Sequence, residues 1–142
     1  MKDKKYIRVG FFDDFKGEDS ILISVDIHGL LELEFVFDKL SKEKTEIDLI
    51  KMKYVDPEFR MKIKMVSTNT DEGLIRKNGN FIWELSTEKW DEIRQKVTGL
   101  YRIGTKGHHY LDSDSKHNND LQVVLSLNEY DKDFWMRNKK KK

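Results

Sequence analysis

The sequence contains no cysteine among its 142 residues. This absence excludes disulfide bonds, thiol catalysis and thiolate zinc sites, and it fits a reducing compartment. Long apolar runs are also missing, since no stretch approaches the roughly 18 residues that a membrane-spanning helix needs. Residues 1–10 are charged and contain no apolar segment of the signal-peptide kind. We therefore expect a cytoplasmic protein with no segment in the membrane.

Neither sign of charge is in excess, because 27 basic residues nearly balance 26 acidic ones. A field over the whole molecule that would attract nucleic acid or a membrane surface is therefore not expected. The apolar content of 37% is enough for one sizeable core, and the length is typical of one domain. We expect this domain to span residues 1–138, followed by a disordered basic tail at 139–142.

The only proline, Pro57, marks a turn, because proline cannot continue a strand ladder. Around it, runs rich in β-branched and aromatic residues, or alternating apolar and charged ones, predict strands. In the second half, Asn78-Gly79 between two apolar runs predicts a hairpin. The predicted strands lie at 6–12, 21–27, 45–53 and 59–66, in the two arms of 73–85, after 107, and within 120–130.

Apolar residues spaced by three and four predict a first helix of about four turns. Leu31, Phe35 and Val36 widen its apolar stripe, and Asp26 is placed to cap its first turn. The stripe itself comprises Leu30, Leu33, Phe37 and Leu40.

A second helix is predicted after Ser86 or Thr87, which can cap it, and it should end near Gly99 or Gly104. An offset of 60 residues superimposes its stripe on that of the first helix, and it also aligns flanking strand residues. The aligned pairs include Ile23 with Trp83, Leu30 with Trp90, Leu33 with Ile93, Phe37 with Val97, Leu40 with Leu100, and Met65 with Leu125.

Together these patterns predict an α+β fold. Both halves, 6–66 and 72–127, read as strand, strand, helix, strand, strand, which is a tandem ββαββ pseudo-repeat. Two amphipathic helices that each follow a hairpin are best buried against one face of a mostly antiparallel sheet, with the other face left wet. The aromatic segment 130–136 is expected to dock on this body.

The first candidate surface is an acidic loop between the first two strands. It combines Phe12 and Phe15 with four carboxylates, and aromatic residues interleaved with charge are typical of interfaces. In the alternative interpretation, the phenylalanines fold under into the core. The acidic residues are Asp13, Asp14, Glu18 and Asp19.

The second candidate is the stretch 107–124, which holds three of the four histidines. Metal ligation would require His108 or His109 to converge with Asp112 and His117, but adjacent residues of a strand point to opposite faces. We therefore favour a polar hairpin whose residues contribute to a contact surface, with no metal or other cofactor. Its partner-binding residues would be His108, His109, Asp112 and Asp114.

A third pattern, Arg60, Lys62 and Lys64, alternates with apolar residues along a predicted strand. These cations could hold a phosphate backbone, which makes a phosphate or nucleic-acid binder one alternative function. The other is a metal-dependent protein that uses His108 or His109 with Asp112 and His117. The simpler interpretation is the solvated face of a sheet, and nucleic acid is not the expected partner.

Signatures of catalysis are missing, because the chain has no G-x-S-x-G elbow, no phosphate-binding loop, no H-E-x-x-H and no cysteine nucleophile. His28 beside Asp26 fits the first turn of a helix better than a catalytic dyad. We therefore expect a protein that is not an enzyme.

The segments "DSILISVDIHGLLEL" and "GHHYLD…DLQVVLSLNEY" resemble small bacterial proteins of the immunity-protein type, which belong to polymorphic-toxin and contact-inhibition systems. The resemblance touches about a third of the chain. It implies a cytoplasmic protein that neutralises a cognate toxin by direct binding, and it supplies no catalytic residues. The protein could also form a homodimer through such a surface.

Overall fold

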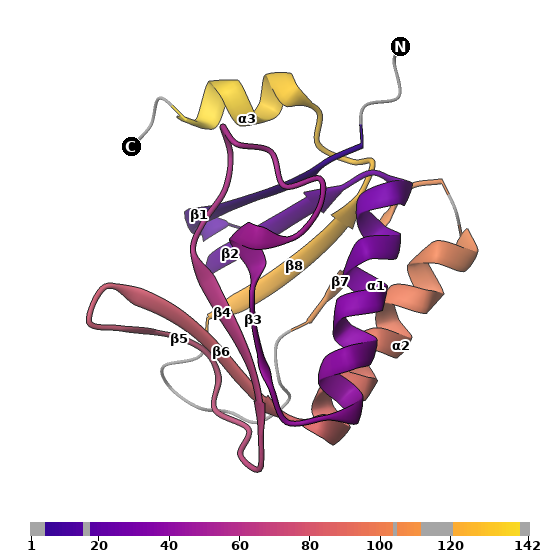
Figure 1. Ribbon diagram of the computed structural model, residues 1–142. Helices are drawn as coiled ribbons and strands as arrows, with labels where there is room; N and C mark the ends of the chain where they lie inside the picture. The colour runs from indigo at the N-terminus through magenta and orange to yellow at the C-terminus, as the bar shows by residue number, and fades with distance from the viewer. Residues whose placement is uncertain (1–4, 16–17, 104, 112–120, 140–142) are drawn as a thin grey trace.

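The computed structural model describes residues 5–15, 18–103, 105–111 and 121–139. Its elements repeat the order ββαββ and end in an additional helix (Figure 1). The first unit comprises β1 (Ile7–Phe15), β2 (Glu18–Val25), α1 (Ile27–Lys42), β3 (Glu46–Asp48), the 3-10 turn η1 (Leu49–Lys51) and β4 (Ile63–Thr68). The second comprises β5 (Gly73–Lys77), β6 (Asn80–Ser86), α2 (Thr87–Ile103), β7 (Gly107–Tyr110) and β8 (Gln122–Leu127), and is followed by α3 (Lys132–Lys139).

The strands form two mixed sheets, in the orders β1-β2-β8-β7 and β3-β4-β6-β5. Each sheet takes one antiparallel pair from each unit, and the pairs join through a parallel ladder, β2 with β8 or β4 with β6. The expected α+β class and the excess of antiparallel pairs are confirmed. The expectation of one sheet is corrected to two, because each antiparallel pair of one unit joins a pair of the other unit through a parallel ladder.

The two parallel ladders have the same register. Ile21 pairs with Val123, and Phe81 pairs with Ile63. Adding 60 to the number of Ile21 gives Phe81, and subtracting 60 from that of Val123 gives Ile63. The same relation holds for the following pairs up to the ends of β2 and β8. The two units are therefore related by an approximate two-fold axis that exchanges the sheets.

The helices α1 and α2 lie together on one side of both sheets (Figure 1) and bury the predicted stripes against them. Asp26 caps α1 as expected, since its carboxylate accepts a hydrogen bond from Gly29 N at 2.9 Å. In the centre of the core, Phe37 stacks on Trp90 with centroids 5.6 Å apart, and Trp83 meets Trp90 edge to face. One apolar core thus contains residues from both units.

Two predicted strands are shorter in the structure. The run 45–53 forms only β3 and then the turn η1, and the strand expected at 59–66 begins at Ile63. The intervening backbone bonds to the edge of β1 instead: Ile7 N donates to Tyr54 O at 2.8 Å, and Val9 N donates to Phe59 O at 2.9 Å. The segment that carries the single proline therefore closes the gap between the two sheets.

The aromatic segment docks on the outer face of the first sheet, as expected. Trp135 of α3 is buried there with Leu22, Phe59 and Val124. Its ring occupies the space beside Gly10, where a Cβ atom would approach the ring to 2.8 Å. The absence of a side chain at Gly10 of β1 therefore leaves the space that the indole ring of Trp135 occupies.

Among the described residues, no helix is long and apolar enough to cross a membrane.

We predict that Gly10→Val displaces Trp135 and lowers the free energy of unfolding by about 2 kcal/mol, in the range of overpacked cores. Urea denaturation followed by tryptophan fluorescence would measure the loss, and amide exchange should accelerate in α3. Gly99→Ala is the control, because nothing lies within 4 Å of its Cβ position in α2, and alanine favours helices. Equal stability of Gly10→Val and the wild type would show that the packing of Trp135 does not depend on the space beside Gly10.

A buried ion pair holds the 54–59 segment against β1. The guanidinium of Arg8, with only 6% of the residue exposed, donates to Asp56 at 2.9 Å. Burial alone raises the pKa of Asp56, but hydrogen bonds from Glu58 N and Arg8, with the charge of Arg8, outweigh it and lower the pKa. Because the folded pKa lies below the unfolded one, this pair stabilises the fold above the unfolded pKa, and the stabilisation is lost as the pH falls below it.

We predict that Asp56→Ala lowers the free energy of unfolding by about 3 kcal/mol at neutral pH, because it leaves a buried guanidinium without its partner. Lys42→Ala is the matched control, since it removes the exposed pair with Asp38 and should cost less than about 1 kcal/mol. Chemical denaturation of both variants checks the difference. Similar losses in the two variants would show that the Arg8 pair is not important for stability.

Candidate functional site

Of the acidic-loop residues, Phe12 is half-buried under α3. Its ring centroid lies 5.7 Å from that of Phe134 and 5.4 Å from that of Trp135. For Phe12, the interpretation in which the ring folds onto the body agrees with the structure. Asp19 is exposed at the start of β2. The side chains of the remaining residues of this loop lie outside the described part: Asp13, Asp14, Phe15 and Glu18.

In the histidine stretch, β7 places His108 opposite Ser126 and His109 opposite Leu125. The Nδ1 atom of His108 lies 3.2 Å from a carboxylate oxygen of Glu129, whose other oxygen accepts a hydrogen bond from Ser126 Oγ at 2.7 Å. No cluster of three or more metal-ligating residues occurs in the described ranges. The remaining predicted residues fall outside these ranges: Asp112, Asp114 and His117.

The three cations of the alternative phosphate site do not share one strand. Lys64 lies in β4 and pairs with Glu46 at 3.2 Å. Arg60 and Lys62 are exposed in the segment before β4. Because the strand begins at Ile63, the predicted ladder of three cations on one sheet face is not formed.

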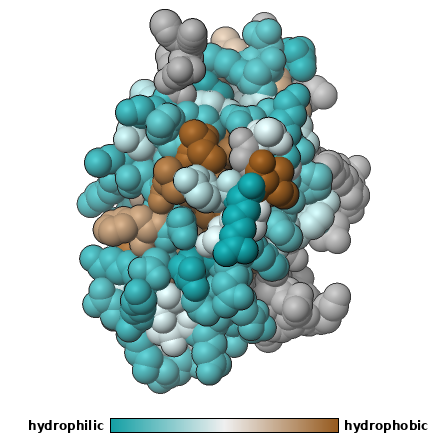
Figure 2. All heavy atoms as spheres, turned by 90° about the vertical axis from the view of Figure 1, so that its right-hand side faces the viewer, coloured by the Kyte–Doolittle hydropathy of each residue, from teal (hydrophilic) through white to brown (hydrophobic). Residues whose placement is uncertain are grey.

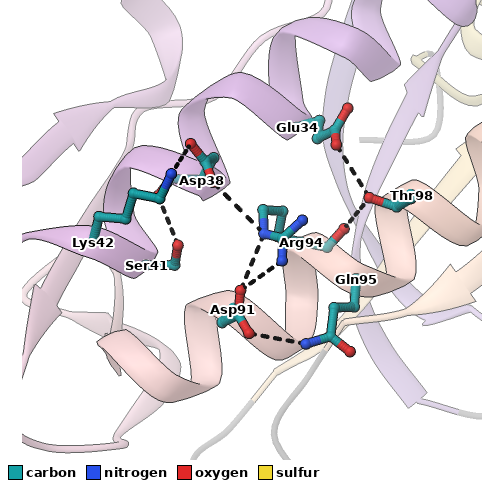
Figure 3. A network of polar contacts seen from close by, with 8 residues as sticks. All are labelled: Glu34, Asp38, Ser41, Lys42, Asp91, Arg94, Gln95 and Thr98. Atoms are coloured by element: carbon teal, nitrogen blue, oxygen red, sulfur yellow. Dashed lines mark hydrogen bonds and ion pairs between the residues drawn. The ribbon is translucent and has the colours of Figure 1, made fainter.

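The solvent side of α1 and α2 forms a surface that we call the helix face. The helices run antiparallel and are bridged by two polar contacts (Figure 3). Thr98 Oγ1 donates to Glu34 at 3.1 Å, and Arg94 Nε lies 3.7 Å from Asp38. The offset of 60 maps Glu34 onto Arg94 and Asp38 onto Thr98. The approximate two-fold axis therefore passes between these contacts and divides the helix face into two equivalent halves.

One half of the helix face is polar. Arg94 donates two hydrogen bonds to Asp91, the shorter at 2.8 Å, and Gln95 donates to the other carboxylate oxygen of Asp91 at 2.9 Å (Figure 3). The hydrogen bonds from Arg94 and Gln95 lower the pKa of Asp91. On α1, Lys42 pairs with Asp38 at 3.2 Å. The charges of this half are thus largely neutralised by neighbours on the same surface.

The other half is apolar. Figure 2 faces this side of the molecule and shows brown side chains gathered in the upper part of an otherwise hydrophilic surface. Four of the six large apolar side chains that are exposed among the described residues belong to these two helices. They are Leu31 (41% exposed), Phe35 (68%), Tyr101 (46%) and Ile103 (60%). We call these four residues the apolar patch.

Each patch residue has a polar equivalent in the other unit. The offset of 60 pairs Leu31 with Asp91 and Phe35 with Gln95. It also pairs Tyr101 with Ser41, and Ile103 with Glu43. Because the backbones of the two units share one arrangement, the fold tolerates polar residues at such positions. The patch is therefore not explained by the needs of the core, and apolar patches of this kind mark interaction sites.

This site was not predicted from the sequence, because Leu31 and Phe35 fit the pattern of a widened core stripe. Only Val36 of the three added residues is buried. The signal was present in the alignment of the halves, which places Asp91 and Gln95 opposite Leu31 and Phe35. A core position would be expected to be apolar in both units, whereas a binding position can be apolar in only one.

The sequence matches no family model, and searches of curated proteins and of solved structures find no similar protein or fold.

The pH dependence of folding provides a test near β7. Burial, together with the charges of Lys96 and His108, lowers the pKa of His109. The folded protein then binds fewer protons than the unfolded chain, so the free energy of unfolding should fall as the pH drops through the unfolded pKa, about 6.5. We predict that His109→Gln reduces this slope in urea titrations between pH 8 and pH 5. An unchanged slope would assign the dependence to other groups.

Proposed function

We propose that the protein is a non-enzymatic binding module that recognises another protein through the apolar patch. The observation that carries the proposal is the polarity difference between equivalent positions of the two units, above all Phe35 against Gln95. Phe35 is 68% exposed at a position where the same fold accepts an amide. Aromatic and aliphatic anchors surrounded by polar residues are typical of the centres of protein interfaces.

The charges around the patch indicate the chemistry of the partner. Lys39 lies one helical turn beyond Phe35, Arg102 follows Tyr101, and both are exposed. Neither cation has a carboxylate partner within the described residues, in contrast to Lys42 in the polar half. The complementary surface would therefore be apolar at its centre and acidic at its rim, which favours association and fixes orientation.

The resemblance to immunity proteins supports the same class of function, because such proteins act by occluding a toxin through direct contact. In that form of the proposal, the partner is a cognate toxin and the protein acts in the cytoplasm. The acidic residues and the histidine stretch would contribute further contacts to the same partner. The apolar side chains would supply most of the binding energy.

We predict that Phe35→Asp weakens partner binding at least about 30-fold, the equivalent of a hot-spot loss of roughly 2 kcal/mol. Gln95→Asp is the matched control, because it places the same residue at the equivalent position of the polar half. Proteins encoded by the neighbouring genes would be purified and titrated by calorimetry, and the growth of cells that produce a toxic neighbour would report protection. Thermal unfolding of both variants should stay near that of the wild type.

Equal affinity of Phe35→Asp and Gln95→Asp for a bound neighbour would show that the partner uses another surface. Light scattering provides a second criterion. A homodimer that Phe35→Asp dissociates would assign the patch to a second copy of the chain and would overturn the proposal of a different protein as partner.

A further inference from the structure

A hollow lies where β8 ends and the chain turns into α3. Its volume is about 530 Å³, which falls within the range of roughly 300 to 1,000 Å³ for small-molecule sites. It is lined by Tyr6, Lys106, Asn128, Glu129, Tyr130, Asp131, Phe134 and Arg137. The lining thus comes from three separate segments of the chain and combines three aromatic rings with four charged groups.

The corresponding end of the first unit is built differently. The chain after β4 continues directly to β5, and the carboxylate of Glu84 there accepts hydrogen bonds from Thr68 at 3.2 Å and Thr70 at 3.0 Å. Asp71 accepts a hydrogen bond from Ser86 N at 2.8 Å at the same end. Only α3, which follows the repeat, supplies the wall formed by Phe134 and Arg137. The hollow is therefore a product of the one helix that the repeat does not account for.

The two carboxylates of the hollow are already engaged. Glu129 accepts a hydrogen bond from Ser126 and lies beside His108. Asp131 caps α3 by accepting a hydrogen bond from Phe134 N at 3.0 Å. Their negative charges are thus committed to contacts within the protein.

The two cations are not engaged in the same way. Neither Lys106 nor Arg137 has an ion-pair or hydrogen-bond partner among the described residues. The half-buried Tyr6 also lines the hollow, and burial raises the pKa of its phenol, so that it stays protonated. Tyr130 and Phe134 pack with ring centroids 4.5 Å apart and offer an aromatic wall.

We propose that this hollow binds a small organic acid, with its anionic group on Lys106 and Arg137 and its apolar part against Tyr130 and Phe134. Lys106 and Arg137 are both exposed, and a carboxylate or phosphate ester that contacts both of them forms charge-assisted hydrogen bonds, which are stronger than neutral ones. The aromatic wall selects anions that carry a ring or chain over inorganic ones. The proposal is independent of the apolar patch and of any protein partner.

The experiment titrates the full chain, labelled with ¹⁵N, with benzoate, phenyl phosphate, inorganic phosphate and the neutral analogue benzyl alcohol. We expect benzoate or phenyl phosphate to produce saturable amide shifts at the hollow, with an affinity at least about tenfold above those of inorganic phosphate and benzyl alcohol. The double variant K106Q/R137Q should weaken the anion at least tenfold. The control K39Q/R102Q removes two other exposed cations and should bind like the wild type.

Four results would overturn the proposal. Binding of benzyl alcohol as tight as that of benzoate would show an apolar site, and inorganic phosphate binding as tightly would show that the aromatic wall has no role. Equal loss in K106Q/R137Q and in the control K39Q/R102Q would show attraction by net charge alone, and the absence of saturable shifts would show that nothing of this class binds. Amide spectra of both variants report whether the fold is retained, and Phe35→Asp should leave the anion affinity unchanged.

Discussion

The parallel ladders between the units are the constraint on which the rest of the structure depends. Each unit alone supplies two antiparallel pairs, and neither pair becomes part of a four-stranded sheet without the other unit. Isolated two-stranded pairs are marginally stable in water. The two parallel ladders therefore convert four weak strand pairs into two sheets around one core. One ladder pairs Ile21 of β2 with Val123 of β8, and its equivalent pairs Phe81 of β6 with Ile63 of β4.

The approximate symmetry also separates structural from functional residues. Positions that are apolar in both units, such as Phe37 and Val97, are buried under the helices. On the helix face, equivalent positions differ in polarity, and this difference distinguishes a self-neutralised polar half from the exposed apolar patch. Likewise α3, which has no equivalent in the first unit, fills the outer face of one sheet and walls the hollow. In both cases the departure from symmetry, and not the repeat, carries the inference about binding.

Much of the local structure could be predicted from the sequence, because it depends on local chemistry. The spacing of Leu30, Leu33 and their aligned partners identified the buried helix stripes, and Asp26 marked the start of α1. The offset between the halves was visible for the same reason. The pairing of β2 with β8 was not predicted, because no local pattern specifies which distant strand completes a sheet. The segment before β4 was predicted as strand, since its alternation of Phe59, Met61 and Ile63 looks the same whether Phe59 faces the core or Trp135.

The candidate site was less accessible than the fold. Sequence reasoning favoured loops, because charge mixed with aromatic residues is typical of surfaces, but Phe12 packs against α3. An amphipathic pattern also gives the approximate width of a buried stripe and not its edge, so Leu31 and Phe35 could be assigned to either side. Their exposure depends on how closely the neighbouring helix packs beside them, and this is a property of the tertiary structure.

The exchange of strands between the units has a consequence for synthesis on the ribosome. The strand β2 leaves the ribosome about a hundred residues before its neighbour β8, since Ser20 pairs with Gln122. Until β8 has been synthesised, β2 has an unoccupied backbone edge that can bind any extended chain of suitable register. A nascent N-terminal half is thus open to pairing with a second nascent copy on the same messenger for as long as β8 has not left the ribosome.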